Sequence, residues 1–414
     1  TAQNLNLNRD YMKADAPEMN ALLGLMGKYD PDFYIDLHVT DGMDYQYDIT
    51  YGFDGWDGLY ADSPAIGNWL NDVYRPKADA ALKAGGHIPG PLIFARDDGD
   101  VSKGTDLPAF APRFSHAYGD LRRLPTVLVE NHSLKPYRQR VLGTYVLLEA
   151  TIKTLGSEAK SLKAAIAADR ELRPSSINAN WKDKAEPVGW LDFLTIASEE
   201  VMSPASGGMV TRFNGKPGPT VKIPVYGSEP GLQLSVAKAY WVPSTKPDVI
   251  ARLKAHGVEM ETLTAPRTIE MEMTRLTGFK LGQPAEGRVP VSATGVQPET
   301  RTVTYHPGSV RISTDQPLGA LVAYLLEPQS EDSFLASGFF NEILSRVEYM
   351  EPYAIAPMAE RMLAENPALK GEFEARLASE PEFAASPLRR LQFFYERSPF
   401  YDDRYLIYPV GREM

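Results

Sequence analysis

The sequence contains no cysteine, which excludes disulfide bonds and thiolate chemistry. Any zinc site must therefore use histidine and carboxylate ligands. No apolar run approaches the roughly 18–20 residues that a membrane-spanning helix needs. The chain has 43 basic residues (Lys and Arg) and 54 acidic residues (Asp and Glu). The resulting formal net charge of −11 argues against a nucleic-acid groove, which needs a basic face. We therefore expect neither a membrane span nor a nucleic-acid partner.

What remains is the composition of a globular protein, in a chain of 414 residues that is long enough for two or three domains. The first residues, Thr1-Ala2-Gln3, include neither an initiator methionine nor a signal peptide. This favours a chain that begins after a processing event or after a further segment. We expect a secreted or periplasmic bacterial protein.

A buried strand that ends in a histidine dominates the first part of the chain. Residues 33–38 read Phe-Tyr-Ile-Asp-Leu-His, and the apolar run predicts a strand that carries His38 to its carboxyl end. Open α/β sheets bind their ligands at this edge. The alternative is a structural histidine that caps the strand. The acidic, tyrosine-rich segment 41–62 that follows predicts a solvated rim to a pocket, and residues 86–112 predict a second rim.

A second strand with a charged end is predicted at 124–130, where an apolar run finishes on Glu130. Between the strands, residues 63–84 have a helical pattern, and a helix at 17–26 precedes the first strand, with Asp15 as its cap. Helices alternating with buried strands indicate an α/β sheet. If the two strands run the same way, His38 and Glu130 emerge together. The alternative for Glu130 is a carboxylate that caps the next turn.

The later chain has a different character. A long helix is predicted after residue 133, with an apolar stripe at alternate spacings of four and three. The stripe consists of Val141, Tyr145, Leu148, Ile152, Leu155, Ala159, Leu162 and Ile166. Beyond about residue 172 the sequence becomes rich in proline, glycine and short β-type runs, and it ends in a helical, aromatic tail. We predict an α/β domain over 1–172 and a β-rich domain with this tail over 173–414.

The charged residues near these strand ends suggest hydrolytic chemistry. A neutral imidazole at His38 can bind Zn²⁺, and a carboxylate at Glu130 can deprotonate a water molecule. Asn8 and Arg9 precede the first strand, and an arginine can hold a substrate carboxylate by two hydrogen bonds. The alternative for Arg9 is a structural ion pair with Asp10 or Glu18.

Together, Asn8-Arg9-Asp10, Asp36-Leu37-His38, Tyr51-Gly52 and a strand that ends in Glu130 resemble the zinc carboxypeptidases related to carboxypeptidase A. The resemblance covers roughly residues 4–150. It implies a partial carboxypeptidase-like mixed sheet with flanking helices. It also implies that His38 is a zinc ligand, Asn8 and Arg9 bind the substrate carboxylate, and Glu130 is the general base.

The chain departs from that family in one respect. The family's His-x-x-Glu ligand pair lies upstream of Asn-Arg, where this sequence has only seven residues. His256-Gly257-Val258-Glu259 fits the letters, but its position after a short helical run predicts a helix end instead. Arg113 and Tyr118 are candidates for a replacement cation and a substrate-facing hydroxyl, although packing roles are favoured for both. We expect an associated N-terminal segment that carries the missing ligands, since the His38 strand would otherwise have an unpaired edge.

The predicted function is zinc-dependent hydrolysis of a carboxy-terminal peptide bond, or of a related amide with a free carboxylate. Asp36 would fix the tautomer of His38 as a hydrogen-bond acceptor. Two alternatives remain open. One is a deacylase or amidase of the same metal chemistry that acts on small molecules. The other is a metal-free binding or structural protein that has the same fold.

Overall fold

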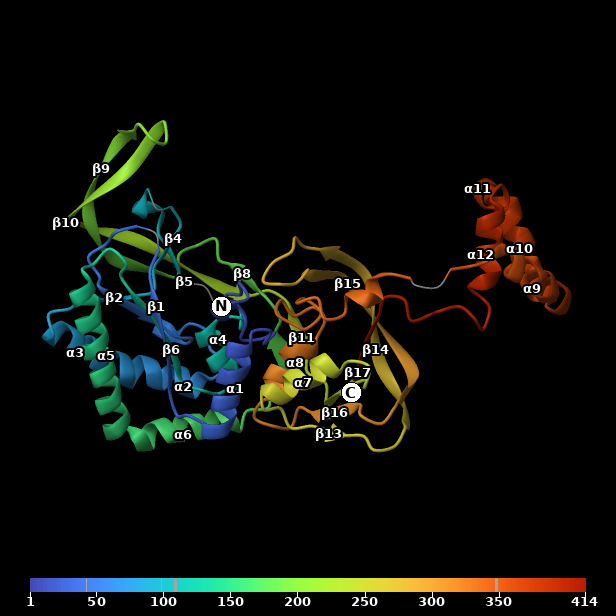
Figure 1. Cartoon of the computed structure of the whole chain (residues 1–414), viewed down its shortest axis with the longest axis horizontal. Helices are drawn as coiled ribbons and strands as arrows, with labels where there is room; N and C mark the ends of the chain where they lie inside the picture. The colour runs from blue at the N-terminus through green and yellow to red at the C-terminus, as the bar shows by residue number, and fades with distance from the viewer. Residues whose placement is uncertain (42, 98, 108–109, 347–348) are drawn as a thin grey trace.

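The computed structural model describes residues 1–41, 43–97, 99–107, 110–346 and 349–414. An α/β unit lies on the left of Figure 1, a six-stranded sheet lies on the right, and a small group of helices extends beyond it. Within the described residues, no helix is long and apolar enough to cross a membrane. The fold is therefore mixed α/β, as predicted, while the domain boundary near residue 172 stays a prediction.

The site region is built on a four-stranded sheet with the order β1-β6-β2-β3. Its strands are β1 (Tyr34–Val39), β2 (Ile49–Gly52), β3 (Pro89–Pro91) and β6 (Thr126–Asn131). β1 and β6 are parallel, whereas β2 runs antiparallel to β6. The apolar runs predicted as strands form β1 and β6, and residues 127 to 129 of β6 are fully buried at the centre of the sheet.

Helices cover both faces of this sheet. They are α1 (Pro17–Tyr29), α2 (Pro64–Trp69), α3 (Arg75–Ala84), α4 (Ser115–Leu121), α5 (Tyr137–Ser157) and α6 (Ala159–Arg170), with a π-helical turn, η3 (Leu70–Tyr74), between α2 and α3. The predicted cap of α1 is wrong, because Ala16 occupies the cap position. Asp15 instead forms ion pairs with Arg252 and Arg288, which tie the start of the helix to the second half of the chain.

The predicted long helix is two helices, α5 and α6, and its apolar stripe on α5 is also misplaced. The buried face of α5 runs through Gly143, Leu147 and Ala150. Tyr145 and Ile152, which belong to the predicted stripe, are 64% and 71% exposed. A small residue at Gly143 lets the helix approach the sheet closely, since a Cβ there would lie 3.0 Å from Ile49. The buried face of α5 is therefore the one on which a small residue allows close packing against the sheet, and not the one with the regular apolar spacing.

The segment 41–62 is not the solvated rim that its composition predicts. Met43, Tyr45 and Tyr47 are buried in one apolar cluster, and β2 is an interior strand. Phe53 and Trp56 are buried in the α/β core. Residues 42, 98 and 108–109 of the two predicted rims lie outside the described residues.

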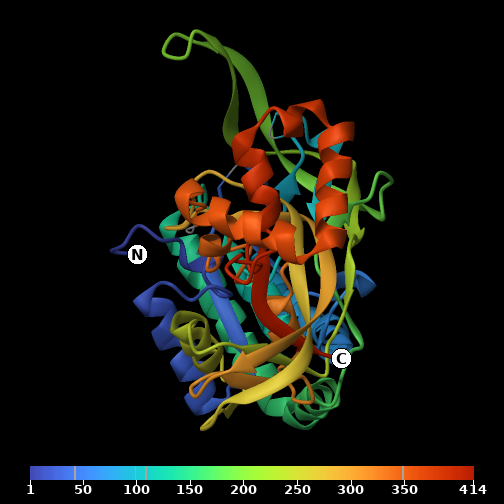
Figure 2. The same ribbon diagram turned by 90° about the vertical axis from the view of Figure 1, so that its right-hand side faces the viewer.

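A second sheet carries a long hairpin. It consists of β4 (Phe94–Ala95), β5 (Thr105–Leu107), β8 (Trp181–Asp183), β9 (Gly189–Ser203) and β10 (Gly208–Pro230). β10 pairs in parallel with β5 and antiparallel with β9. The far end of the β9–β10 hairpin projects away from the body of the molecule in both views (Figures 1 and 2).

The six-stranded sheet is entirely antiparallel among its paired strands, in the order β13-β16-β12-β17-β14-β15. The strands are β12 (Ala239–Val242), β13 (Glu261–Thr262), β14 (Arg267–Leu281), β15 (Val291–Tyr305), β16 (Val310–Ser313) and β17 (Ile407–Glu413). Helices α7 (Pro247–Ala255) and α8 (Gly319–Leu326) contribute to the same core, and β7 (Ser176–Asn178) pairs with β11 (Gln233–Ser235).

The helical, aromatic tail has two parts. α9 (Pro352–Glu365), α10 (Pro367–Ser379), α11 (Pro381–Ala384) and α12 (Pro387–Tyr395) surround a small core of their own that includes Phe373 and Phe393. The chain then returns to the body as β17, where Tyr408 is buried in the main core. The aromatic residues of β17 thus dock on the body of the protein, whereas the helices pack mainly on one another (Figure 2).

Candidate functional site

His38 and Glu130 lie side by side at the ends of two parallel strands. β1 and β6 pair in register, so that His38 is directly opposite Glu130 and Asp36 is opposite Leu128. Because paired residues of neighbouring strands point to the same face, both side chains emerge on one face of the sheet. Thr50 of β2 pairs with Glu130 from the other side. The predicted meeting of His38 and Glu130 at one sheet edge is present in the structure.

Asp36 holds the ring of His38. The Nε2 atom of His38 lies 2.6 Å from Oδ2 of Asp36, two residues back along the same strand. This bond raises the pKa of His38 above its ordinary value, against the effect of burial, and the negative charge of Glu130 acts in the same direction. The contact fixes the ring orientation and leaves Nδ1 for another partner.

Glu130 is a half-buried carboxylate of the site, and its pKa is raised. Its Oε2 atom is buried and has no hydrogen-bond partner among the described residues. Burial raises the pKa of Glu130 to about 7, while the neighbouring charge of His38 lowers it and those of Asp41 and Asp36 raise it further. A carboxyl group that changes protonation near neutral pH is suited to accept a proton from water.

Asn8 and Arg9 belong to a short 3₁₀ turn, η1 (Leu7–Arg9). Oδ1 of Asn8 accepts a hydrogen bond of 2.9 Å from the backbone N–H of Ser115, at the start of α4. The guanidinium of Arg9 lies 4.3 Å from the centre of the Phe114 ring. Its positive charge opposes protonation of His38, so the two groups are electrostatic neighbours.

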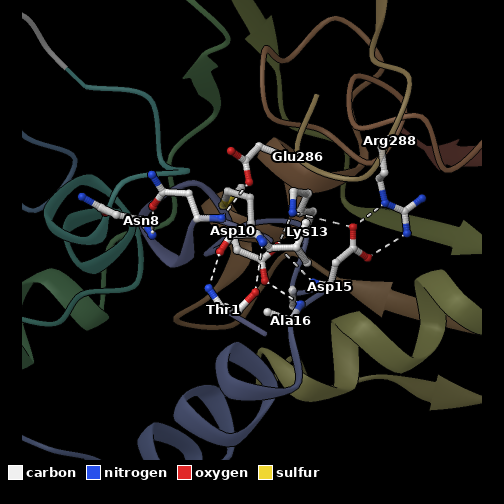
Figure 3. Close-up of polar contacts among 12 residues, drawn as sticks. Thr1, Asn8, Asp10, Lys13, Asp15, Ala16, Glu286 and Arg288 are labelled. Atoms are coloured by element: carbon white, nitrogen blue, oxygen red, sulfur yellow. Dashed lines mark hydrogen bonds and ion pairs between the residues drawn. The ribbon is translucent and has the colours of Figure 1, made fainter. Parts of the chain in front are cut away.

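The alternative ion pair of Arg9 is not formed within the described residues. Asp10 pairs with Lys13 and accepts hydrogen bonds from the backbone N–H groups of Asp15, at 3.1 Å, and Ala16, at 2.8 Å. Asp15 in turn binds Arg288 (Figure 3). These contacts order the segment that carries Arg9. Among the described residues, the guanidinium of Arg9 makes one hydrogen bond, from Nη1 to the carbonyl of Asn8.

His116, on α4, lies within electrostatic range of Asp36 and His38, and the sequence pattern did not point to it. Its side chain is only 3% exposed, and neither ring nitrogen has a partner among the described residues. Burial lowers the pKa of His116 to about 4, and the charges of Asp36 and His38 also act on it. The one feature of the sequence that could have pointed to His116 is its position shortly before the strand that ends in Glu130. A single histidine between small residues carries no periodic pattern.

The other candidates from the sequence have packing roles. Arg113 pairs with Asp332 at 3.0 Å and with Glu331 at 3.5 Å, and so is not a replacement cation for the site. Tyr118 is fully buried, and its hydroxyl lies 2.8 Å from Nδ1 of His256.

The His256 segment forms a helix end, as predicted. His256 is the C-cap of α7, and Gly257 adopts a φ of +83° that favours glycine. The other ring nitrogen of His256 lies 3.0 Å from the carbonyl oxygen of Met12, so both nitrogens are occupied.

The described residues do not make a complete zinc site. Nowhere in 1–41, 43–97, 99–107, 110–346 or 349–414 do three or more histidine and carboxylate side chains form a group that could hold a metal ion. His38 has an available ring nitrogen, but its nearest acidic neighbour, Asp36, binds the other nitrogen. Zinc requires about four ligands in a tetrahedral arrangement, three of them from protein in a catalytic site.

Comparison with known proteins gives one similarity of interest. Carboxypeptidase 2 of Trichophyton rubrum is 29% identical over 111 residues, which cover 27% of this chain and 21% of that protein. The matched part is thus about a fifth of the relative's length. No family model matches the sequence, and no solved structure matches it. The similarity suggests a carboxypeptidase-like relationship for part of the chain.

Proposed function

We propose that the chain carries the carboxylate-binding and proton-accepting part of a peptide hydrolase that removes a carboxy-terminal residue. The observation that supports this most is the pairing of His38 with Glu130 on adjacent parallel strands, within electrostatic reach of Arg9. The partial similarity to a carboxypeptidase points in the same direction. A related amide with a free carboxylate presents the same groups.

In this proposal, Arg9 and Asn8 bind the free carboxylate of the substrate. Arg9 has no carboxylate partner within the described residues, and its planar guanidinium suits two parallel hydrogen bonds. Oδ1 of Asn8 accepts a hydrogen bond from the backbone N–H of Ser115, which fixes the orientation of the Asn8 amide group. The stacking of Arg9 on Phe114 limits its motion, so that less conformational entropy is lost on binding.

Glu130 is proposed as the general base. A pKa of about 7 means that a large fraction of the carboxylate is ionised at neutral pH yet can accept a proton. Its unpartnered Oε2 takes a proton from a water molecule, which attacks the scissile carbonyl carbon. The same proton then passes to the departing amine. General-base catalysis of this kind contributes about 10²–10⁴-fold to the rate.

His38 is proposed as one ligand of a zinc ion whose remaining protein ligands come from another polypeptide segment. The described residues do not supply those ligands, so none of the steps above passes through the metal. When bound, zinc in a hydrolase acts as a Lewis acid towards water and carbonyl oxygen.

An exposed apolar surface next to β1 supports the proposal of an associated segment. β1 pairs only with β6, so its outer edge is open among the described residues. Leu37 and Val39 are 45% and 54% exposed on that strand. They lie on the face that α5 covers elsewhere, where Thr144 hydrogen-bonds to the side chain of Asn131. A strand added at this edge would pair its backbone and cover both side chains.

A second candidate is a metal-free binding protein that recognises a carboxy-terminal carboxylate. It is favoured by the lack of a three-ligand group in the described part of the chain. In that case Arg9 and Asn8 bind the ligand and Glu130 has no catalytic role.

The test is turnover of a peptide with a free carboxylate by purified wild-type protein and by Glu130→Gln. We expect a loss of at least about 100-fold in kcat for the variant, with peptide binding retained. Glu149→Gln, a change at a half-exposed residue of α5, is the matched control. Full activity of Glu130→Gln removes this residue from the mechanism. The zinc content of the same unchelated sample distinguishes the hydrolase from the binding protein. Less than a tenth of an equivalent of zinc per chain favours the binding protein.

A further inference from the structure

α5 carries an apolar stripe on a side that faces solvent. This α5 stripe consists of Tyr137, Val141, Tyr145, Leu148 and Ile152, and all but the half-buried Leu148 are between 46% and 75% exposed. Its members follow one another at spacings of three or four residues, which places them on one face of a helix with about 3.6 residues per turn. Monomeric proteins rarely expose an apolar patch larger than roughly 300–600 Å², so a stripe of this length indicates a binding surface.

The α5 stripe lies on the flank of the helix that is nearer to the open edge of the sheet. Thr144, which precedes Tyr145, donates a hydrogen bond of 2.8 Å to the side chain of Asn131, at the end of β6. Val146, on the other flank, lies against Gly85 at the end of α3. α3 also contacts β3, which is the far strand in the order β1-β6-β2-β3. The flank of α5 that α3 leaves free is therefore turned towards β1.

The second half of β1 forms a floor beside this flank. Ile35 packs in the α/β core, whereas Leu37 and Val39, on the same face of the strand, are 45% and 54% exposed. α6 closes one end of the space, because its Lys163 forms an ion pair with Asp32 just before β1. Figure 1 shows α5 and α6 meeting at an angle below the sheet. The α5 stripe, Leu37 and Val39 thus line an uncovered apolar corner, which we call the α5–β1 corner.

The dimensions of the α5–β1 corner fit one strand and one helix. Neighbouring strands lie about 4.8 Å apart, and packed helices lie about 8–10 Å apart. Since α5 lies over β2 and β6, a helix in contact with its free flank would lie over β1 and one added strand. The added strand would pair with the open edge of β1, and the helix would cover Leu37, Val39 and the α5 stripe. A strand alone would not reach the stripe.

A second copy of this chain does not fill the α5–β1 corner. If two β1 edges paired about a two-fold axis, the two α5 helices would be separated by about four strand spacings, or roughly 19 Å. This distance is about twice that between packed helices, so both stripes would stay exposed. Direct packing of two α5 helices is also opposed by charge, because each has three basic residues and one acidic residue.

The charges next to the α5 stripe favour an acidic partner. α5 is a basic helix on a chain whose formal net charge is −11. Arg140, directly before Val141, has a buried Nε atom without a hydrogen-bond partner among the described residues. Lys153, directly after Ile152, is paired with Glu149 at 2.8 Å. A carboxylate supplied by a bound segment would satisfy Arg140 with a charge-assisted hydrogen bond.

We infer that the α5–β1 corner binds an acidic polypeptide segment that adds a strand to β1 and packs an amphipathic helix along α5. The inference rests on the proposed function for the strand, which is placed at the same edge, and it adds the helix, its position and its charge. Backbone pairing with β1 fixes the register of the segment, and the apolar face of the helix contacts Tyr145 and Ile152. Because β1 carries His38, the bound segment also lies beside the proposed site.

Binding of synthetic peptides tests the inference without any need for turnover. The first probe is a fluorescein-labelled amphipathic helix of about 20 residues, close to the length of α5, with leucine on one face and glutamate on the other. The second probe has lysine in place of glutamate. Fluorescence anisotropy at low salt should show the acidic probe binding at least about tenfold more tightly than the basic one. Equal affinities, or no binding of either probe, overturn the inference.

A third probe tests the strand. It has a valine- and threonine-rich strand joined to the acidic helix, and it should bind more tightly than the helix alone, because the second contact is intramolecular. Hydrogen exchange should then slow at backbone amides of residues 34–39, since the outer edge of β1 becomes paired. Unchanged exchange of this strand with the third probe bound overturns the inference.

Variants of the α5 stripe locate the binding. Tyr145→Glu and Ile152→Glu place a negative charge among the apolar contacts, so each should weaken binding of the acidic helix at least about tenfold. Both side chains are mostly exposed, so the fold should be kept, which circular dichroism checks. Leu25→Glu alters a 53% exposed residue of α1, which packs in a different core cluster, and should bind the probe as the wild type does. Binding that survives in both stripe variants overturns the inference.

The outcome for the α5–β1 corner is separable from that for the hydrolase. Probe binding that depends on Tyr145 and Ile152, in a protein without turnover, supports the corner and rejects the proposed reaction. Turnover by a protein that binds none of the probes supports the reaction and rejects the corner. Light scattering should show a monomeric chain, and a dimer that Ile152→Glu dissociates would assign this face to a second copy and overturn the inference.

Discussion

His38 and Glu130 face each other across one rung of the parallel β1–β6 pair, at the carboxyl ends of their strands. Each alters the proton affinity of the other, since the imidazolium lowers the pKa of Glu130 and the carboxylate raises that of His38. Their fixed spacing depends on two paired strands, the edge strand β1 and the buried strand β6, rather than on a loop, which gives a proton-accepting group a defined position.

The first prediction concerns the pH dependence of turnover. Glu130 must be ionised to act as a base, and its pKa is about 7. The rate constant kcat/KM should therefore rise between about pH 6 and 8, with a midpoint near 7 instead of near the ordinary value for glutamate. Initial rates on one peptide across this range measure it. A rising limb centred near pH 4.5 would exclude Glu130 as the base.

The second prediction concerns Arg9. Replacement by glutamine removes the charge that holds the substrate carboxylate, so KM for a peptide with a free terminus should rise about 10- to 100-fold. The same peptide with an amidated terminus should be little affected, because it lacks the carboxylate. Arg138→Gln, on α5, provides a control of equal charge change. Equal KM values for wild type and Arg9→Gln contradict the clamp.

The third prediction concerns the bond between Asp36 and His38. Asp36→Asn removes the main cause of the raised pKa of His38, and burial should then move that pKa below its ordinary value. Titration of the imidazole by NMR measures the shift directly. Asp32→Asn, at an exposed residue before β1, should leave the titration of His38 unchanged. An unchanged His38 pKa in Asp36→Asn contradicts the contact.

The fourth prediction concerns acid stability. The folded state holds His116 neutral with a pKa of about 4, whereas the unfolded chain has the ordinary value of 6.5. The unfolded state therefore binds a proton first, and stability is lost as the pH falls from about 6.5 to 4, by roughly 3 kcal/mol at most. His116→Leu should remove this part of the pH dependence. Urea unfolding at pH 7 and pH 4.5 measures it.

His306 provides the control for that experiment because its side chain is exposed. His306→Leu should retain the wild-type loss of stability on acidification. If His116→Leu also loses the full wild-type amount, His116 does not set the acid sensitivity, and the buried His256, with a pKa of about 4, is the next candidate.

Local sequence determined the elements that carry the proposed site. The apolar runs before His38 and Glu130 are dense enough to specify strands, and their charged ends follow from the position of those runs. Only the second strand is buried as predicted, because β1 lies at the edge of the sheet and is half-buried. Alternation within β1 put Asp36 on the side of His38. The order of Asn8 and Arg9 before the first strand also gave a site hypothesis, which remains a prediction.

Only the tertiary structure decided which residues meet. The parallel register of β1 and β6 depends on segments about 90 residues apart, which no local pattern encodes. The buried face of α5 was set by close packing at Gly143, so the apolar stripe that includes Tyr145 faces outward. His116 gained its interest because both of its ring nitrogens are buried without a partner among the described residues. That property belongs to the surroundings of a side chain, which form only when the chain has folded.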